Sequence, residues 1–136
     1  MTVPFETHAL ESAPTVTAPD GSAVRPLGRI PGAGSFAHFR LSAGEVAQAV
    51  VHATVQEIWY VIAGAGEMWR RQRDTGFAET VALGPGVCLT IPLGTEFQFR
   101  AAPDAALEVV AATMPPWPVT SETEATPVEG IWAPTV

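Results

Sequence analysis

Hydrophobic and polar residues alternate along much of the chain in runs of five to eight residues. A period of two places successive side chains on opposite faces of a β-strand. Turn signals such as Asp20-Gly21 and Gly84-Pro85-Gly86 separate the runs. The pattern predicts nine short strands, over residues 23–29, 35–41, 47–53, 57–62, 67–73, 78–83, 87–91, 96–101 and 107–114. Short strands at this regular spacing are typical of a β-sandwich or a small β-barrel.

Glycines and prolines leave little room for helices and mark three segments of the chain. Twelve glycines and thirteen prolines leave few windows in which an amphipathic helix could form. We expect an N-terminal arm over residues 1–22, a single barrel over residues 23–114 and a C-terminal tail over residues 115–136. The tail begins Pro-Pro-Trp-Pro, which cannot continue a sheet, so we expect it to pack on the barrel through Trp117 and Trp132.

Composition and charge narrow the classes of function. The 136 residues match one domain, and 47% hydrophobic residues with 15% charged residues indicate a packed core. Seven arginines against fourteen acids, with no lysine, give a net charge of −7, which disfavours nucleic acid and anionic membranes as partners. Cys88 is the single cysteine, so an internal disulfide is excluded. The first residues lack the apolar core of a secretory signal, and we expect a cytoplasmic protein.

Two spaced motifs in the middle of the chain resemble those of the cupin superfamily. Gly44, His52, Glu57 and Gly64 fit the first cupin motif, G-x5-H-x-H-x4-E-x6-G, with Val50 in place of its first histidine. Farther along, the Gly86, Pro92 and Gly94 spacing resembles the frame of the second motif, G-x5-P-x-G-x2-H-x3-N. The resemblance covers residues 23–113. It implies an all-β double-stranded β-helix, the jelly-roll barrel of a small single-domain cupin.

The resemblance also implies a metal site, from which this chain departs. Cupins usually hold a divalent metal on three histidines and one glutamate. Here Phe97 replaces the third histidine, Ala101 replaces the asparagine, and of the ligand set only His52 and Glu57 remain. Two donors rarely hold zinc, iron or manganese tightly, so no metal cofactor is expected. A divalent metal remains possible if another donor joins His52 and Glu57, the candidates being His38, Thr54, Gln56 and Glu96.

Strand alternation indicates which side chains face the inside of this barrel. If Glu57 points inward, Trp59 and Val61 do so too, whereas Ile58 and Tyr60 point outward. We interpret Gly64-Ala65-Gly66 as a tight hairpin, across which opposed residues face the same side. The same alternation predicts further inward side chains, namely Met68, Arg70, Gln72, Cys88, Thr90, Phe97 and Phe99.

A pocket follows from these orientations. We expect Trp59, Met68, Phe97 and Phe99 to wall it, and Arg70 to supply a charge. A buried charge is costly unless it is paired, so we hypothesise that the Arg70 guanidinium neutralises Glu57 in place of a metal.

The residues support three hypotheses of function. The first is a cupin that binds a small anionic or partly aromatic molecule, with Trp59, Met68, Arg70, Phe97 and Phe99 as binding residues. The second is an enzyme, either a metal-dependent oxygenase or isomerase with rearranged ligands, or a metal-free acid/base catalyst using His52 and Glu57. The third is a structural or regulatory dimer whose barrel is filled by side chains. Apolar strand faces and long flanking arms favour a homodimer in each case.

Overall fold

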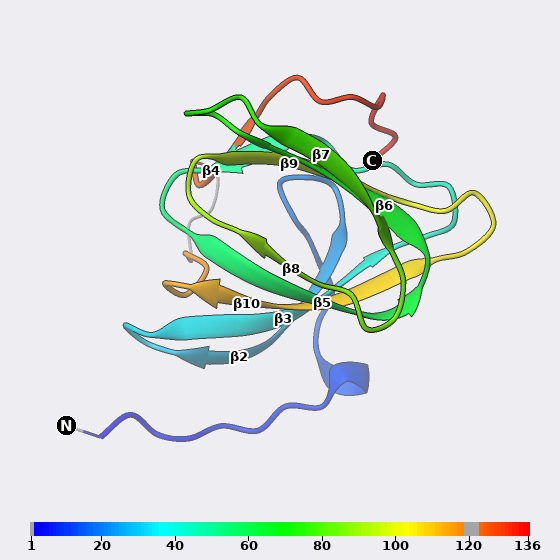
Figure 1. Cartoon of the computed structure of the whole chain (residues 1–136). Coiled ribbons are helices and arrows are strands. Elements are labelled where there is room, and N and C mark those ends of the chain that lie inside the picture. The colour runs from blue at the N-terminus through cyan, green and yellow to red at the C-terminus, as the bar shows by residue number, and fades with distance from the viewer. Residues whose placement is uncertain (1, 119–122) are drawn as a thin grey trace.

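Two antiparallel sheets face each other in the computed structural model, which describes residues 2–118 and 123–136 (Figure 1). The first sheet has the order β1-β2-β3-β10-β5-β8 and contains Val16–Thr17, Ala23–Ile30, Gly34–Leu41, Leu107–Met114, Gln56–Gly64 and Cys88–Ile91. The second has the order β11-β4-β9-β6-β7 and contains Ala125–Pro127, Val50–His52, Thr95–Ala101, Gly66–Gln72 and Ala78–Leu83. Their inner faces enclose the hydrophobic core, as in a jelly roll.

The nine predicted strands are confirmed, with ends that differ by at most three residues. The structure adds two short strands from the flanking segments. Strand β1 pairs with β2, and β11 pairs with β4 through the Ala125 and His52 positions. Strands of two or three residues are too short to show an alternation, so the sequence pattern could not reveal them. Besides the strands there is a 3-10 turn, η1, at Leu10–Ser12. The described residues contain no helix long and apolar enough to cross a lipid bilayer.

The connection at Gly64-Ala65-Gly66 carries the chain from one sheet to the other, so the predicted hairpin is wrong. Strand β5 lies in the first sheet, whereas β6 pairs with β7 and β9 in the second. Gly64 has a φ of +84°, and a Cβ there would lie 1.7 Å from the carbonyl oxygen of Ala106. Only glycine fits this crossing, because a side chain would collide with backbone.

The alternation predicted within β5 is confirmed, whereas β6 and β9 bury residues on both of their faces. Trp59 and Val61 are buried, and Ile58 and Tyr60 are exposed. Met68, Phe97 and Phe99 are buried as well, although they face Trp59 from the opposite sheet rather than across a hairpin.

Three inward predictions near the barrel edge are wrong. Strand β8 pairs with β5 so that Ile91 lies opposite Glu57 and Cys88 lies opposite Tyr60. Opposed residues share a face, so Leu89 and Ile91 point inward, whereas Cys88 and Thr90 are exposed. Gln72, at the end of β6, is also exposed.

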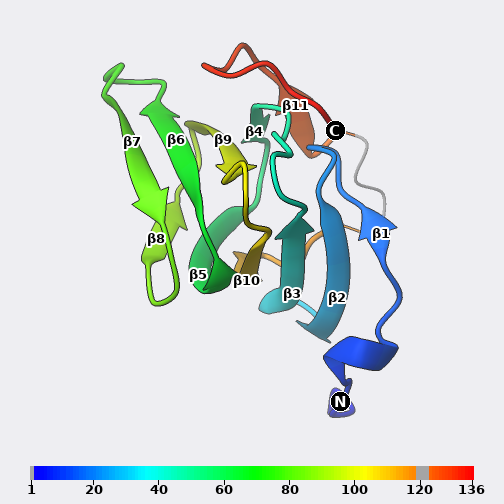
Figure 2. The ribbon, with the colours of Figure 1, turned by 90° about the vertical axis from the view of Figure 1, so that its right-hand side faces the viewer.

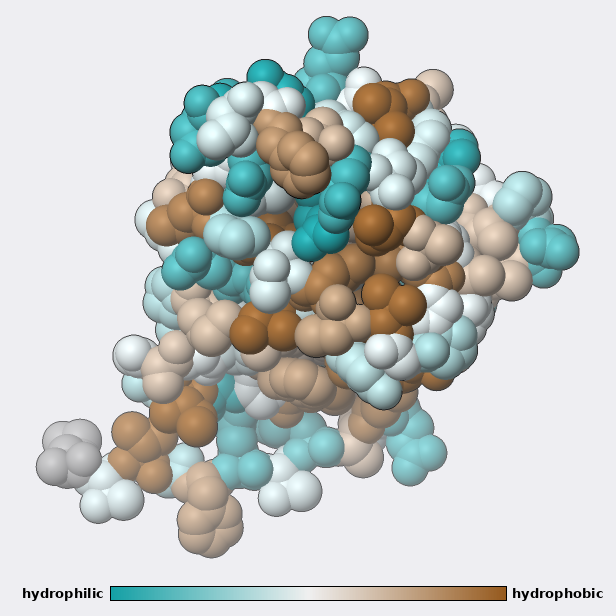
Figure 3. All heavy atoms as spheres, in the orientation of Figure 1, coloured by the Kyte–Doolittle hydropathy of each residue, from teal (hydrophilic) through white to brown (hydrophobic). Residues whose placement is uncertain are grey.

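The two ends of the chain attach to the barrel in different ways. The C-terminal segment lies over the second sheet, where the buried amide of Gln98 bonds to the backbone of Ile131 and Trp132 (Figure 2). The N-terminal arm projects from the body with hydrophobic side chains along it, and Phe5 is 99% exposed (Figure 3). Its Glu6 carboxylate accepts a hydrogen bond from the backbone of Arg29.

Candidate functional site

A cavity of about 480 Å³ lies between the sheets, beside strands β2 to β5. Its wall is mostly aromatic and aliphatic, with Phe39, Val50, Trp59, Phe97 and Trp117 among the lining residues. This volume is in the range of small-molecule sites in proteins. The cavity therefore opposes the hypothesis that side chains fill the barrel completely.

Trp59 is the most constrained member of this wall. Its ring stacks on Phe39 with centroids 5.5 Å apart, and it meets the edges of Phe97 and Phe99 at 6.0 and 4.9 Å. These contacts fix the indole in one orientation. Its Nε1 is buried and has no hydrogen-bond partner in the described part of the chain.

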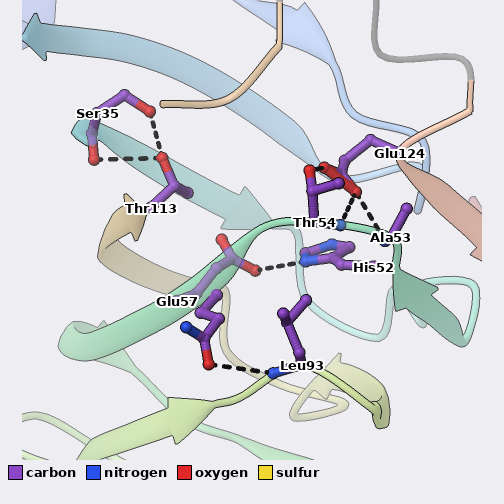
Figure 4. A network of polar contacts seen from close by, with 9 residues as sticks. Ser35, His52, Ala53, Thr54, Glu57, Leu93, Thr113 and Glu124 are labelled. Carbon is purple, nitrogen blue, oxygen red and sulfur yellow. Dashed lines mark hydrogen bonds and ion pairs between the residues drawn. The ribbon is translucent and has the colours of Figure 1, made fainter. Parts of the chain in front are cut away.

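The polar centre of the cavity is the pair formed by His52 and Glu57. His52 ends β4 and Glu57 is the second residue of β5, so a three-residue turn brings them together. His52 Nδ1 lies 3.6 Å from Glu57 Oε2, and the two side chains are only 7% and 3% exposed (Figure 4). The His52 ring also contacts the rings of Phe97 and Trp117, each with a centroid distance of 5.2 Å. The structure thus brings together the two residues that the sequence assigned to one candidate site.

Glu124 holds the turn that joins these two residues. Its carboxylate accepts hydrogen bonds from the backbone N–H of Ala53 at 2.7 Å and of Thr54 at 2.8 Å, and from the Thr54 hydroxyl (Figure 4). Burial acts to raise the pKa of Glu124, but the bonds from Thr54 and Ala53 outweigh it and lower that pKa. Glu124 thus remains an anion that fixes the backbone beside His52.

Burial makes both members of the pair prefer their neutral forms. It raises the pKa of Glu57 to about 8; the charges of Asp20 and Glu124 add to this rise, and the nearby indole N–H of Trp59 opposes it. Burial lowers the pKa of His52, and the charge of Glu124 only partly opposes this. At neutral pH the pair is therefore a carboxylic acid beside a neutral imidazole, one able to give a proton and the other to accept one.

Asp20 is a cavity residue that sequence reasoning missed, because Asp20-Gly21 was interpreted only as a turn. It is buried, lines the cavity and accepts hydrogen bonds from the backbone and hydroxyl of Ser22 at 2.9 and 2.6 Å. Burial raises its pKa. Trp117 is a second such residue: it was expected only to attach the tail, yet it also lines the cavity.

The predicted binding residues separate into three groups. Trp59 and Phe97 line the cavity, whereas Met68 and Phe99 are fully buried in the core. Arg70 lies elsewhere: its Nη1 donates to the Thr90 carbonyl at 2.9 Å and its Nη2 lies 3.2 Å from Glu79 Oε1. The hypothesis that Arg70 neutralises Glu57 is wrong, because the Arg70 guanidinium bonds to Thr90 and Glu79 at the β7 and β8 edge and does not line the main cavity.

The donors that could rearrange into a metal site are engaged in other contacts. His38 bonds to Glu108 at 2.9 Å, Glu96 pairs with two arginines, Gln56 accepts from Leu93, and Thr54 donates to Glu124. Within residues 2–118 and 123–136, no three His, Cys, Asp or Glu side chains form a group that could bind a metal. His52 and Glu57 alone are too few donors for a tight zinc, iron or manganese site.

Comparison with known proteins relates this geometry to one class of fold. No protein-family model matches the chain, and no curated protein matches it. Among solved structures, CapF of Staphylococcus aureus, a capsular polysaccharide assembling protein, superposes with a TM-score of 0.74 at 12% identity. That match covers 87% of this chain and 34% of CapF, so this chain spans about a third of the length of CapF.

Two further solved structures are similar to this chain, one over nearly its whole length and one over a third of its length. Pac13, described as a nucleoside dehydratase, has a TM-score of 0.70 at 16% identity, with 96% of this chain and 95% of Pac13 covered. A variant of Streptomyces PAC13 with uridine is similar at 0.71. An oxalate decarboxylase variant of B. subtilis has a TM-score of 0.71 at 16% identity, with 94% of this chain and 33% of that chain covered. All are cupin-fold proteins, and this chain has the cupin jelly-roll fold.

The raised pKa of Glu57 makes the stability of the protein depend on pH. Between about pH 4.5 and pH 8 the unfolded chain releases this proton while the folded chain keeps it, so the free energy of unfolding falls as pH rises. The side chain introduced in Glu57→Gln cannot ionise. From pH 5 to pH 8 we therefore expect the free energy of unfolding of Glu57→Gln to rise, relative to that of the wild type, by on the order of a few kcal/mol. Urea unfolding at each pH measures this difference.

Glu67→Gln is the matched control for this experiment, because Glu67 is 43% exposed and pairs with Arg100 on the surface. Its effect should stay below about 1 kcal/mol at every pH. Parallel pH profiles for the wild type and Glu57→Gln would show that Glu57 is ionised in the folded protein, contrary to this account.

Proposed function

We propose that the protein is a small cupin that binds a small, partly aromatic and uncharged molecule in its main cavity, without a tightly bound metal. The observation that carries the proposal is the cavity itself, an aromatic wall with two unpartnered polar atoms. Those atoms are Nδ1 of His52 and Nε1 of Trp59, neither of which has a hydrogen-bond partner among the described residues. Buried polar atoms without partners are costly, and a ligand with its own donors and acceptors would satisfy them.

The charge around the cavity favours an uncharged ligand over the anion expected from the sequence. That expectation rested on Arg70, which lies away from this cavity. The carboxyl groups of Asp20 and Glu57 line it instead. Arg29 also lines it, but its Nη1 donates to the Trp117 carbonyl at 2.8 Å. An anion would meet carboxyl groups and an occupied arginine, whereas a neutral ring would meet aromatic faces.

A nucleoside is a ligand of suitable size and chemistry. It combines an aromatic ring with hydroxyl and amide groups, and a cavity of about 480 Å³ is large enough for it. The structure with uridine is of a protein that this chain matches over nearly the whole length of both. This likeness makes uridine a reasonable first probe.

A second candidate is a metal-free enzyme that removes water from such a molecule. The observation that favours it is the pair of a protonated Glu57 and a neutral His52 at 3.6 Å. In an elimination, His52 takes a proton from carbon as a C=C bond forms, and the C–O bond breaks as Glu57 protonates the leaving hydroxyl. Pac13, described as a nucleoside dehydratase, has a similar fold at 16% identity, and this likeness motivates a test for the loss of water.

Ligand binding can be tested with two histidine variants. A set of nucleosides and small heteroaromatic compounds, beginning with uridine, is screened by thermal shift and then by calorimetry. We expect His52→Gln to weaken binding about fivefold or more, through the loss of a buried hydrogen bond. His38→Gln should leave binding unchanged, because His38 is equally buried but bonds to Glu108 outside the cavity.

The same variants separate binding from catalysis. Mass spectrometry of each bound compound detects the loss of one water, and both His52→Gln and Glu57→Gln should abolish that loss if the protein is a dehydratase. Binding without conversion would favour the binding function alone. Equal effects of the His38 and His52 variants on affinity would contradict the proposal that the cavity is the ligand site.

The metal content of the protein tests the proposal that no metal is tightly bound in the main cavity. We expect far less than one iron, manganese, nickel or zinc per chain in untagged protein purified without chelator, because His52 and Glu57 supply too few donors. Elemental analysis before and after soaking with these metals measures it. A stoichiometric metal that His52→Gln removes would show that other donors complete the site.

We also propose that the protein is a homodimer formed through the outer face of the first sheet. Phe36 and Ile58 lie in one cross-strand row of that face and are each 43% exposed, and Tyr60 beside them is 48% exposed. Burying such an apolar surface stabilises association. Sedimentation velocity should give a dimer for the wild type and a monomer for Ile58→Asp. A monomeric wild type at micromolar concentration would contradict this arrangement.

A further inference from the structure

A second, smaller cavity lies at the edge of the barrel where β7 of one sheet approaches β8 of the other. It has a volume of about 150 Å³, and among the described residues it shares none with the main cavity. Phe97, which lines the main cavity, pairs in register with Arg70, which lines the second. The two cavities therefore lie on different sides of Phe97.

Arg70 lines this second cavity, and one nitrogen of its guanidinium makes no hydrogen bond to the described residues. Nη1 donates to the Thr90 carbonyl at 2.9 Å and Nη2 to Glu79 Oε1 at 3.2 Å. Nε is buried, and residues 2–118 and 123–136 provide no hydrogen-bond partner for it. A buried N–H of a charged group that has no hydrogen-bond acceptor is unfavourable.

Thr95, which also lines this cavity, has a second polar atom without a partner among the described residues. The residue is 3% exposed, and its Oγ1 is buried with no partner in the described chain. Its backbone N–H is satisfied by the Pro92 carbonyl. Thr95 lies opposite Gln72 in the register of β6 and β9. This pair is two positions along the strands from the pair of Arg70 and Phe97, so it lies on the same face. Diagonal neighbours of this kind are close enough for one small molecule to contact both.

We propose that this second cavity binds a small monocarboxylate, held between Nε of Arg70 and Oγ1 of Thr95. Both groups can donate a hydrogen bond, one of them with a positive charge, and a carboxylate offers two oxygens to receive them. The volume equals that of about five water molecules, which suits an acid of a few heavy atoms. Phe77 and Pro92 supply apolar surface for its carbon end.

The negative charge of Glu79 disfavours binding of a carboxylate beside Arg70, so a variant without this charge should change the affinity in the opposite direction to the Arg70 and Thr95 variants. Its carboxylate shares Arg70 with the proposed ligand, but its side chain is 49% exposed, so water screens its charge. The carboxylate ligand would lie in the buried part of the hollow, where attraction to Arg70 is less screened. Removal of the Glu79 charge should therefore tighten binding.

Acetate and formate are the probes, titrated into the full-length protein and followed by the NMR signals of the Arg70 Nε–H and the Thr95 amide. We expect saturable shifts in the wild type, at least tenfold weaker binding in Arg70→Gln, about fivefold weaker binding in Thr95→Val, and tighter binding in Glu79→Gln. Arg71→Gln is the matched control. It removes the same charge from the next residue, whose partner Glu96 lies outside this cavity.

Three results would overturn the proposal. These are shifts that do not saturate, equal weakening by Arg70→Gln and Arg71→Gln, or a crystal grown with formate in which the cavity contains water alone. Thr95→Val keeps the shape of the side chain, so it remains informative if the Arg70 variant does not fold. Because uridine should not compete with acetate, the outcome is also independent of the function proposed for the main cavity.

Discussion

The contact of Trp59 with three phenylalanine rings sets the spacing of the two sheets, and the main cavity depends on it. Trp59 stacks on Phe39 within its own sheet and meets the edges of Phe97 and Phe99 from the other. This cluster of large rings holds the sheets apart on one side. Next to it, small residues such as Ala37 line the space and do not fill it. The hollow is thus a consequence of large and small side chains lying side by side between two rigid layers.

The electrostatic character of this hollow follows from a buried acid that no arginine of the described chain neutralises. Glu57 lies among aromatic rings, and the titratable side chain beside it is His52, which burial also keeps neutral. The anionic Glu124 does not pair with it but holds the adjacent turn through backbone N–H groups. The result is a site with polar atoms but little net charge, which suits proton exchange and neutral ligands better than the binding of cations or anions.

Local patterns in the sequence predicted much of this arrangement. Alternation placed Trp59 inside and Tyr60 outside, and motif spacing brought His52 and Glu57 together across a short turn. Both inferences depend on residues close together in sequence. The errors arose where the partner strand had to be known: Cys88 was assigned to the wrong face, and the turn at residues 64–66 was taken for a hairpin rather than a crossing. A shift of one residue in pairing reverses every side chain of a strand.

The sequence by itself determined nine of the strands, because they follow from periodicity, and its resemblance to the cupin motifs, with Val50 and Phe97 at two histidine positions, indicated the jelly-roll class. Only the tertiary structure decided what surrounds Glu57. Asp20 and Glu124 come from opposite ends of the chain, and Arg70, although close to Glu57 in sequence, turns to another edge. The environment of a buried charge depends on long-range contacts between segments, and residue spacing along one strand does not encode them.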